Sequence, residues 1–342
     1  MKLKSIIKVL KSRGLFKNWF SAGLKYFLWR RDLLKEDAIS IICRDGAKGD
    51  IPIGLFGPII NAYFHGVIKE FSCIKKSVVT WYDSEIPLEE LLAGSAWVYA
   101  LRFGWRYNNV NGYWFKGNVK FKHMYEPILE VFEYGEYEKL NVNGKIVIDV
   151  GAFIGDSAIY FAIKGAERVI AIEPIPINYL EMLENIKLNS LDIKKIMPIN
   201  AALGSERGNL RIKIIEPHMY SLRNSPLDEL RTWNSNDTYV YVPKITLMDI
   251  INEFNIDTSR SVLKMDCEGC EFDIILKDYD HVKLFDEIYF EHHTYLTGTS
   301  INRLLKLLEK DYKCDIVSTE NFYKRHGLGI EHLGLIYCKK QT

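Results

Sequence analysis

The sequence lacks the features that mark membrane-spanning and secreted proteins. No apolar run reaches the length of a transmembrane helix; the stretch from Trp19 to Trp29 comes closest, but it is short and Lys25 interrupts it. The small-residue cleavage pattern of a signal peptide is also missing. Net charge is nearly absent, at +1 for 342 residues, so no global attraction to nucleic acid is expected. We therefore predict a cytoplasmic protein that binds no nucleic acid.

Cysteine is sparse as well, with six residues spread along the chain. This distribution is unlike the dense framework of small disulfide-rich secreted domains, and it predicts reduced thiols. Cys267 and Cys270 have CxxC spacing, but no second pair exists that would complete a four-cysteine zinc site. We accordingly predict neither a redox nor a metal role for this pair.

Charge is unevenly distributed, which marks residues 1–31 as a basic arm. This segment contains nine Lys or Arg residues and no acid, so the rest of the chain carries a net charge of −8. Leu3, Ile6, Ile7 and Leu10 recur at helical spacing between the lysines. Such a helix could make peripheral contact with anionic lipid or hold a lipid-linked substrate. The alternative is a terminal helix that packs its apolar face on the rest of the protein.

Residues 32–122 are the second expected region, of mixed or β-rich structure. Arg44-Asp45-Gly46 and Asn111-Gly112 are turn signals, and the second suits a tight hairpin with positive φ. Twelve of the 44 aromatic residues lie between Trp81 and Tyr125. They could stack against sugars or bases, but a small domain also needs such residues for its core, and we favour the core.

Residues 123–342 alternate predicted strands and helices and make up the third region. Apolar strands are predicted at 145–149, 168–173, 196–199, 262–266 and 287–291, and two last strands near 314–318 and 333–338 could pair as a hairpin. Thr246 and Asp249 have the spacing of a helix-capping pair. Strands separated by helices predict an α/β fold with a doubly wound, mostly parallel sheet and helices on both faces.

The first of these strands runs into a glycine-containing loop. Gly151 and Gly155 follow Asp149 and are four residues apart, whereas a dinucleotide-binding loop has the spacing GxGxxG. Glycine lets the backbone turn sharply and approach a ligand closely. Asp156 stands where the next helix begins; a carboxylate there would repel a pyrophosphate but would suit a ligand that carries an ammonium and a sulfonium group.

The second strand ends in Glu173, 22 residues after Gly151. A carboxylate at about this offset can accept hydrogen bonds from both hydroxyls of a ribose, because it offers two acceptor oxygens. The alternative is an ordinary exposed strand end. Because Glu173 accompanies the glycine loop at this distance, we favour ribose binding.

The fourth and fifth strands both end in titratable residues. These are Asp266, Glu268 and Glu271 after one strand and Glu291, His292 and His293 after the other. Crowded carboxylates repel one another, so one of them, or a histidine, could take a proton from a hydroxyl nucleophile. The same residue types could also hold a hard divalent ion, or Glu271 could simply cap the next helix while a histidine packs. We predict Asp266, Glu268 and His292 as catalytic residues and no metal.

Five segments together resemble the FkbM-type methyltransferase family. They are 148–156, 171–174, 200–204, 245–249 and 263–271, and they occur in the family's order and spacing between residues 144 and 293. Cys270 occupies a position of the family's DxEGxE pattern that is usually small or apolar. One departure is Phe153, where the family commonly has Asn.

The resemblance implies a class I methyltransferase sheet, S-adenosylmethionine as the methyl donor, and O-methylation of a hydroxyl on a sugar, glycan, glycolipid or other small-molecule acceptor. The cofactor-binding residues would be Asp149, Gly151, Gly155, Asp156, Glu173 and Ala201. The first three would cradle the methionine end, Glu173 would hold the ribose, and Asp266 would lie near the transferred methyl. Two alternatives are a nicotinamide-dependent oxidoreductase on the same fold and a scaffold without catalysis.

Overall fold

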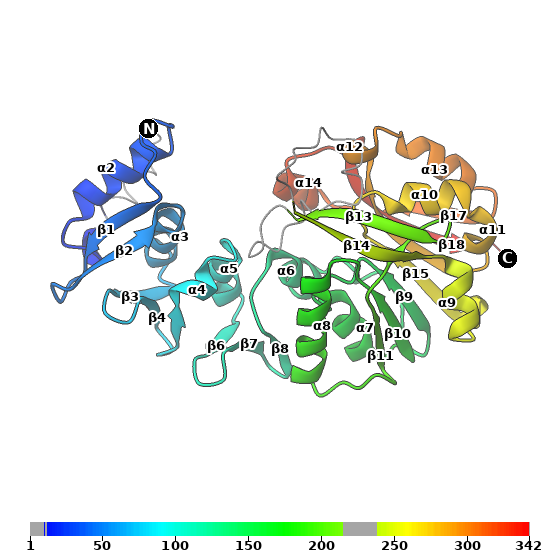
Figure 1. The fold of residues 1–342 in the computed structure, drawn as a ribbon, viewed down its shortest axis with the longest axis horizontal. Coiled ribbons are helices and arrows are strands. Elements are labelled where there is room, and N and C mark those ends of the chain that lie inside the picture. Colours follow the sequence, from blue (N-terminus) through cyan, green and yellow to red (C-terminus); the bar gives the residue numbers. More distant parts are fainter. Residues whose placement is uncertain (1–9, 11, 215–237, 342) are drawn as a thin grey trace. The chain divides into compact units, whose positions relative to one another are not determined.

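The computed structural model describes residues 10, 12–214 and 238–341, so Leu3, Ile6 and Ile7 of the basic arm lie outside the described residues (Figure 1). The chain divides into two compact units, Met1–Leu129 and Glu130–Thr342. Each unit is described by itself below.

The first unit combines short helices with small antiparallel sheets. Its elements are α2 (Trp19–Trp29), β1 (Ala38–Ile42), β2 (Lys48–Pro52), α3 (Ile53–Phe64), β3 (Ile68–Ser72), β4 (Ser77–Thr80), β5 (Glu85–Pro87), α4 (Leu88–Leu91), α5 (Ala96–Arg102), β6 (Arg106–Asn108), β7 (Tyr113–Lys116) and β8 (Val119–Phe121). Strands pair in order as β1-β2, β3-β4-β5 and β6-β7-β8. The expected β-rich addition is thereby confirmed.

Two local predictions for this unit are also confirmed. Gly112 has φ +65° in the turn between β6 and β7, a conformation that glycine adopts without steric cost. Trp97, Trp105 and Trp114 are at most 1% exposed, so these three form core as predicted, whereas Trp81 and Tyr82 of the same cluster are 59% and 67% exposed and do not.

The second unit is built on a seven-stranded sheet. Its strands are β9 (Ile146–Val150), β10 (Arg168–Ile172), β11 (Ile196–Ile199), β15 (Ser261–Met265), β16 (Glu287–His293), β17 (Tyr312–Ile316) and β18 (Leu333–Lys340). The spatial order is β11-β10-β9-β15-β16-β18-β17; the pairs from β11 to β16 are parallel, and β18 is antiparallel to both of its neighbours. This confirms the doubly wound, mostly parallel sheet and the C-terminal hairpin.

Helices and a smaller sheet surround these strands. They comprise α6 (Glu126–Phe132, at the boundary between the units in sequence), α7 (Asp156–Ile163), α8 (Pro176–Leu188), α9 (Leu247–Glu253), α10 (Cys270–Lys277), α11 (Tyr279–Val282), α12 (Thr294–Thr297), α13 (Ile301–Leu308), α14 (Glu320–His326), and the β12-β14-β13 sheet of Ala202–Leu203, Thr238–Ile245 and Gly208–Ile214. The predicted pair at the start of α9 is a capping box: Asp249 N donates to the Thr246 hydroxyl, and Thr246 N donates to the Asp249 carboxylate.

The central strands of the sheet are buried along their whole length, as the inner strands of a parallel sheet must be. One face is apolar: Ile148, Leu263, Met265 and Phe290 belong to one core cluster with residues of α9, α10 and α13. Side chains alternate between the two faces of a strand. The intervening residues of β9, β15 and β16 therefore share the opposite face, and several of them are charged.

The structure corrects our expectation of reduced cysteines. All six are paired, as Cys43–Cys73, Cys267–Cys270 and Cys314–Cys338. Cys314 and Cys338 lie opposite each other in the β17–β18 register, a pairing that spacing along the chain does not reveal. Because disulfides persist mainly in oxidising compartments, the cysteines no longer support the predicted cytoplasmic location. Within the described part of the chain, no helix has the length and apolar character needed to cross a bilayer.

Candidate active site

The predicted site residues converge on the carboxyl edge of the parallel strands. From β9 the strand order runs outward through β10 and β11 on one side and through β15 on the other (Figure 1). β16 follows β15. In open α/β sheets, ligands bind beyond the carboxyl ends of the strands at such a reversal. The loops after β9 and β15 meet at this point.

Gly151 makes that meeting possible. Its φ is +76°, and a Cβ at this position would lie 1.7 Å from the carbonyl oxygen of Asp266. Only glycine satisfies both conditions, because any side chain would push the two loops apart. Phe153 in the same loop has φ +46°, and Glu268 in the facing loop has φ +56°. Backbone strain of this kind persists only where the surrounding structure enforces it, and it is concentrated at functional sites.

A buried lysine holds the two loops together. Lys264, on β15 and 1% exposed, lies 2.9 Å from Oδ1 of Asp149 and donates to the carbonyl of Gly151 at 3.1 Å. Ser157 donates to the other Asp149 oxygen at 2.6 Å. Burial alone lowers the pKa of Lys264, but the carboxylates of Asp149 and Asp266 raise it above its ordinary value. The Asp149 side chain is therefore engaged by the protein itself and fixes the loop.

Sequence reasoning missed Lys264, although a signal was present. A lysine in the middle of an apolar run that reads as a buried strand requires a carboxylate partner in the interior. Asp149 is the acid that the neighbouring strand supplies, since Lys264 lies beside it in the β9–β15 register.

Asp156 opens α7 with a buried carboxylate. Asp156 is 4% exposed, and its Oδ1 has no hydrogen-bond partner in the part of the chain that the structure describes. Burial raises its pKa to about 7, and Asp149 adds to the rise while Lys264 opposes it. A buried acceptor without a donor is costly unless a ligand supplies one. The ammonium group of an amino-acid moiety is such a donor.

Glu173 and Asn178 lie together after β10. The Glu173 carboxylate accepts hydrogen bonds from Phe153 N and Ile175 N, both at 2.9 Å, and from Asn178 Nδ2 at 3.3 Å. Burial raises the pKa of Glu173 to about 8, while these donors oppose the rise because they favour the charged form. Oδ1 of Asn178 has no hydrogen-bond partner among the described residues. This corner of the site therefore retains acceptors for ligand hydroxyls.

Ala201 follows β11 and is 2% exposed. The amide of its neighbour Asn200 donates to the carbonyls of Glu173 and Pro174, at 2.8 and 3.1 Å. These bonds tie the end of β11 to the loop after β10 and place Ala201 beside the Glu173 corner.

Acidic side chains gather at the tips of β15 and β16. Asp266 and Glu268 retain 31% and 19% of their side-chain exposure, and Glu291 is 9% exposed overall. Burial raises the pKa of Glu268 to about 7 and that of Glu291 well above its ordinary value; Asp266 adds to both shifts. The site thus offers many hydrogen-bond acceptors, and its carboxylates would repel a further negatively charged group.

His293, rather than His292, faces these acids. Nε2 of His293 lies 3.8 Å from Oδ1 of Asp266 and 3.7 Å from Oε2 of Glu268. His292 directly precedes His293 on β16 and therefore points to the other face of the sheet. There its Nδ1 lies 3.1 Å from the Thr294 hydroxyl. Burial lowers the pKa of His292 to about 4. The structure thus brings Asp266 and Glu268 together and leaves His292 apart from them.

Glu271 positions His293. One Glu271 oxygen accepts from the backbone nitrogen of His293 at 2.8 Å and lies 3.1 Å from Nδ1, while the other accepts from Gly269 N at 3.0 Å. Burial alone lowers the pKa of His293, but Glu268 and Glu271 raise it well above its ordinary value. The pairing with Nδ1 directs Nε2 at the acidic cluster.

Comparison with known proteins identifies the domain that holds these residues. The model of the Methyltransferase FkbM domain matches residues 149–314, from Asp149 on β9 to the middle of β17. The match confirms the family resemblance inferred from the motifs. No curated protein matches the sequence.

Several solved structures are similar to this chain at low identity. The tRNA m1G37 methyltransferase of M. jannaschii has 15% identity and a TM-score of 0.36, covering 67% of this chain and 56% of its own. M. capricolum TrmK in complex with S-adenosylhomocysteine has 11% identity and a TM-score of 0.35, and the match covers 62% of this chain and 69% of TrmK. The O-methyltransferase from Bacillus cereus, also in complex with S-adenosylhomocysteine, has 11% identity and a TM-score of 0.33, and the match covers 58% of this chain and 74% of that enzyme. The chain thus spans little more than half of the first protein.

Proposed function

Because residues 149–314 form an S-adenosylmethionine-dependent methyltransferase domain of the FkbM type, we propose that the protein O-methylates a hydroxyl of a sugar, glycan or glycolipid. The observation that carries this proposal is the partly exposed cluster of Asp266, Glu268 and Glu291 beside the glycine loop. Carboxylates accept hydrogen bonds from hydroxyls and repel phosphates. A neutral, hydroxyl-rich acceptor fits this chemistry.

The residues on the other side of the site suit the donor. Asp156 offers a buried acceptor to the ammonium group, and Glu173 with Asn178 offers acceptors to the ribose hydroxyls. Gly151 and Gly155, with φ of +76° and +86°, set the path of the loop that would run beside the donor, and the buried Ala201 follows the neighbouring strand. When bound, S-adenosylmethionine supplies a methyl group on a sulfonium, whose loss leaves a neutral thioether.

The acceptor side needs a base, because the hydroxyl proton must leave as the new O–C bond forms. Asp266 is our candidate, since it lies at the strand tip next to the glycine loop and remains partly exposed. Glu268 lies beside it and can share the proton. The remaining contribution to catalysis is alignment of donor and acceptor.

A nicotinamide-dependent oxidoreductase is a weaker candidate. Its pyrophosphate would meet the start of α7, where the buried carboxylate of Asp156 stands in place of free backbone donors. A thermal-shift comparison with S-adenosylhomocysteine, NAD and no ligand separates these readings. Stabilisation by S-adenosylhomocysteine alone supports the proposal, stabilisation by NAD contradicts it, and no response to either favours a scaffold.

Replacement of Glu173 with alanine should weaken S-adenosylhomocysteine binding at least tenfold in calorimetry. Each charge-assisted hydrogen bond lost is worth about 1.5–3 kcal/mol. Glu184→Ala, on the exposed side of α8, is the matched control and should leave the affinity unchanged. Equal affinities for the two variants would remove Glu173 from the donor site.

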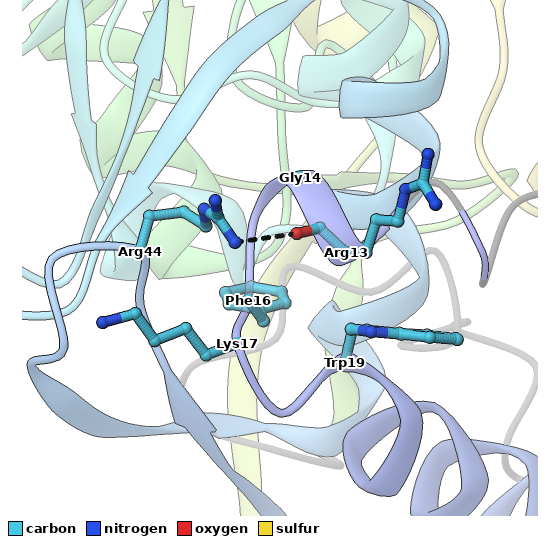
Figure 2. Close-up of a pocket in the computed structure, with 6 residues that line it drawn as sticks. All are labelled: Arg13, Gly14, Phe16, Lys17, Trp19 and Arg44. Atoms are coloured by element: carbon cyan, nitrogen blue, oxygen red, sulfur yellow. Dashed lines mark hydrogen bonds between the residues drawn. The ribbon is translucent and has the colours of Figure 1, made fainter.

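We also propose that the region around α2 contacts anionic membranes. Phe20 and Leu24, one helical turn apart on α2, are 66% and 48% exposed. Beside the start of α2 is a cavity of about 390 Å³ whose lining contains Arg13, Lys17 and Arg44 and no acid (Figure 2). Exposed apolar residues next to a cationic pocket suit insertion between anionic headgroups.

Co-sedimentation with vesicles tests this contact. The protein should pellet with vesicles that contain phosphatidylserine, pellet less as salt rises, and stay in solution with neutral phosphatidylcholine vesicles. Lys17→Glu should reduce pelleting, whereas Arg102→Glu, an exposed change on α5, should not. Equal recovery with both lipids would mean that α2 only packs on its own unit.

A further inference from the structure

The acidic cluster contains a ligand set for a metal ion. Asp266, Glu291 and His293 each offer one ligand atom, and these three atoms lie within 4.8 Å of one another. Two ligand atoms about 2.2 Å from one octahedral ion are roughly 3.1 Å apart at neighbouring positions and roughly 4.4 Å apart at opposite positions. The 3.8 Å between Nε2 of His293 and Oδ1 of Asp266 lies between these separations and is too long for a hydrogen bond.

Strand geometry places these residues together. Glu291 and His293 are two positions apart on β16, so their side chains leave the same face. Met265 pairs with Phe290 in the parallel β15–β16 register, which sets the next residue, Asp266, beside Glu291. Two of the three residues therefore lie on β16, and the third directly follows the end of β15.

The posture of His293 is a separate indication of a ligand. The His293 side chain is 3% exposed, Nδ1 is held by the Glu271 carboxylate, and Nε2 is directed at carboxylates without reaching hydrogen-bond distance. Metal-ligating histidines characteristically donate their second ring nitrogen to a carboxylate in this way. With Nδ1 held in this way, Nε2 of His293 is left facing the carboxylates of Asp266 and Glu268.

We propose that Asp266, Glu291 and His293 bind a divalent cation of the Mn²⁺ type. Two carboxylates suit Mg²⁺, Ca²⁺ and Mn²⁺, whereas imidazole favours transition metals, and Mn²⁺ accepts both. A divalent charge at this position also offsets the excess of buried acids around it. This conclusion departs from the sequence-based prediction of no metal.

The inference rests on the proposed function and deepens it. Asp266 has two carboxylate oxygens, so one can bind the ion while the other faces the acceptor hydroxyl. A hydroxyl bound to the cation loses its proton more readily, which reduces the demand on the base. The site would therefore select acceptors with a hydroxyl that can reach the ion.

Binding of Mn²⁺ to the chelator-treated full chain tests the proposal, with free Mn²⁺ followed by electron paramagnetic resonance. We expect one ion per chain, and at least tenfold weaker binding for Glu291→Gln and for His293→Gln. Glu309→Gln, an exposed change at the end of α13, is the matched control and should bind like the wild type. Absence of binding, or binding that neither site variant weakens, would overturn the proposal.

Two further measurements keep the outcome clear. Anomalous diffraction from crystals soaked in Mn²⁺ should locate the ion at His293 without any substitution; an ion elsewhere only would contradict the site. S-adenosylhomocysteine binding to the chelated protein separates the two proposals. Donor binding without Mn²⁺ binding refutes the metal site alone, whereas Mn²⁺ binding without donor binding refutes the methyltransferase function.

Discussion

Replacement of Asp266 with asparagine should reduce methyl transfer by a factor of roughly 10²–10⁴ and leave donor affinity near that of the wild type. Asparagine keeps the shape of the side chain but can neither accept the hydroxyl proton nor supply a negative ligand atom. The partly exposed side chain contributes little packing, and the contact with Gly151 is made by the Asp266 backbone, which the substitution retains. The loss should therefore appear in turnover.

Transfer of labelled methyl groups into glycan and glycolipid fractions measures this effect, and calorimetry with S-adenosylhomocysteine supplies the affinity. His292→Ala is the informative comparison, because we predicted a catalytic role for His292 from the sequence, whereas the structure directs its side chain away from Asp266. We expect His292→Ala to lower stability and to retain most turnover. The proposed base is wrong if Asp266→Asn transfers methyl groups at a near-native rate.

The sheet and its glycine loop were predictable because both depend on local patterns. Apolar runs separated by amphipathic helices predicted β9, β10, β15 and β16 within a few residues, and the capping pair of Thr246 and Asp249 needs only a three-residue spacing. The Gly151 loop could likewise be recognised from its position after a buried strand. Such features are determined by residues close together in the sequence, so they can be predicted without knowledge of the tertiary structure.

The features that sequence reasoning missed all depend on contacts between distant segments. His292 and His293 are adjacent, and the sequence does not tell which of them faces the acidic cluster. Only the orientation of β16 in the sheet shows that it is His293. The disulfide Cys314–Cys338 follows from strand register. The role of Lys264 likewise depends on the adjacency of β9 and β15. Lys264 and Val150, whose carbonyl its Nζ contacts, are 114 positions apart in the sequence.

Replacement of Lys264 with methionine should destabilise the second unit by about 3–5 kcal/mol, because the Asp149 carboxylate would remain charged in the interior without its cation. Both side chains are at most 1% exposed, so water cannot take over this role. Donor affinity should fall as well, since Lys264 also holds the Gly151 carbonyl. Urea unfolding and calorimetry measure the two effects.

The matched control is Lys277→Met, which breaks an exposed ion pair with Asp273 and should cost less than about 1 kcal/mol. The double variant Asp149→Asn/Lys264→Met should recover part of the lost stability, because no unpaired charge remains. It should not recover donor affinity, since the lysine contact with the Gly151 carbonyl is still missing. If Lys264→Met costs no more than Lys277→Met, the buried pair does not hold the loops together.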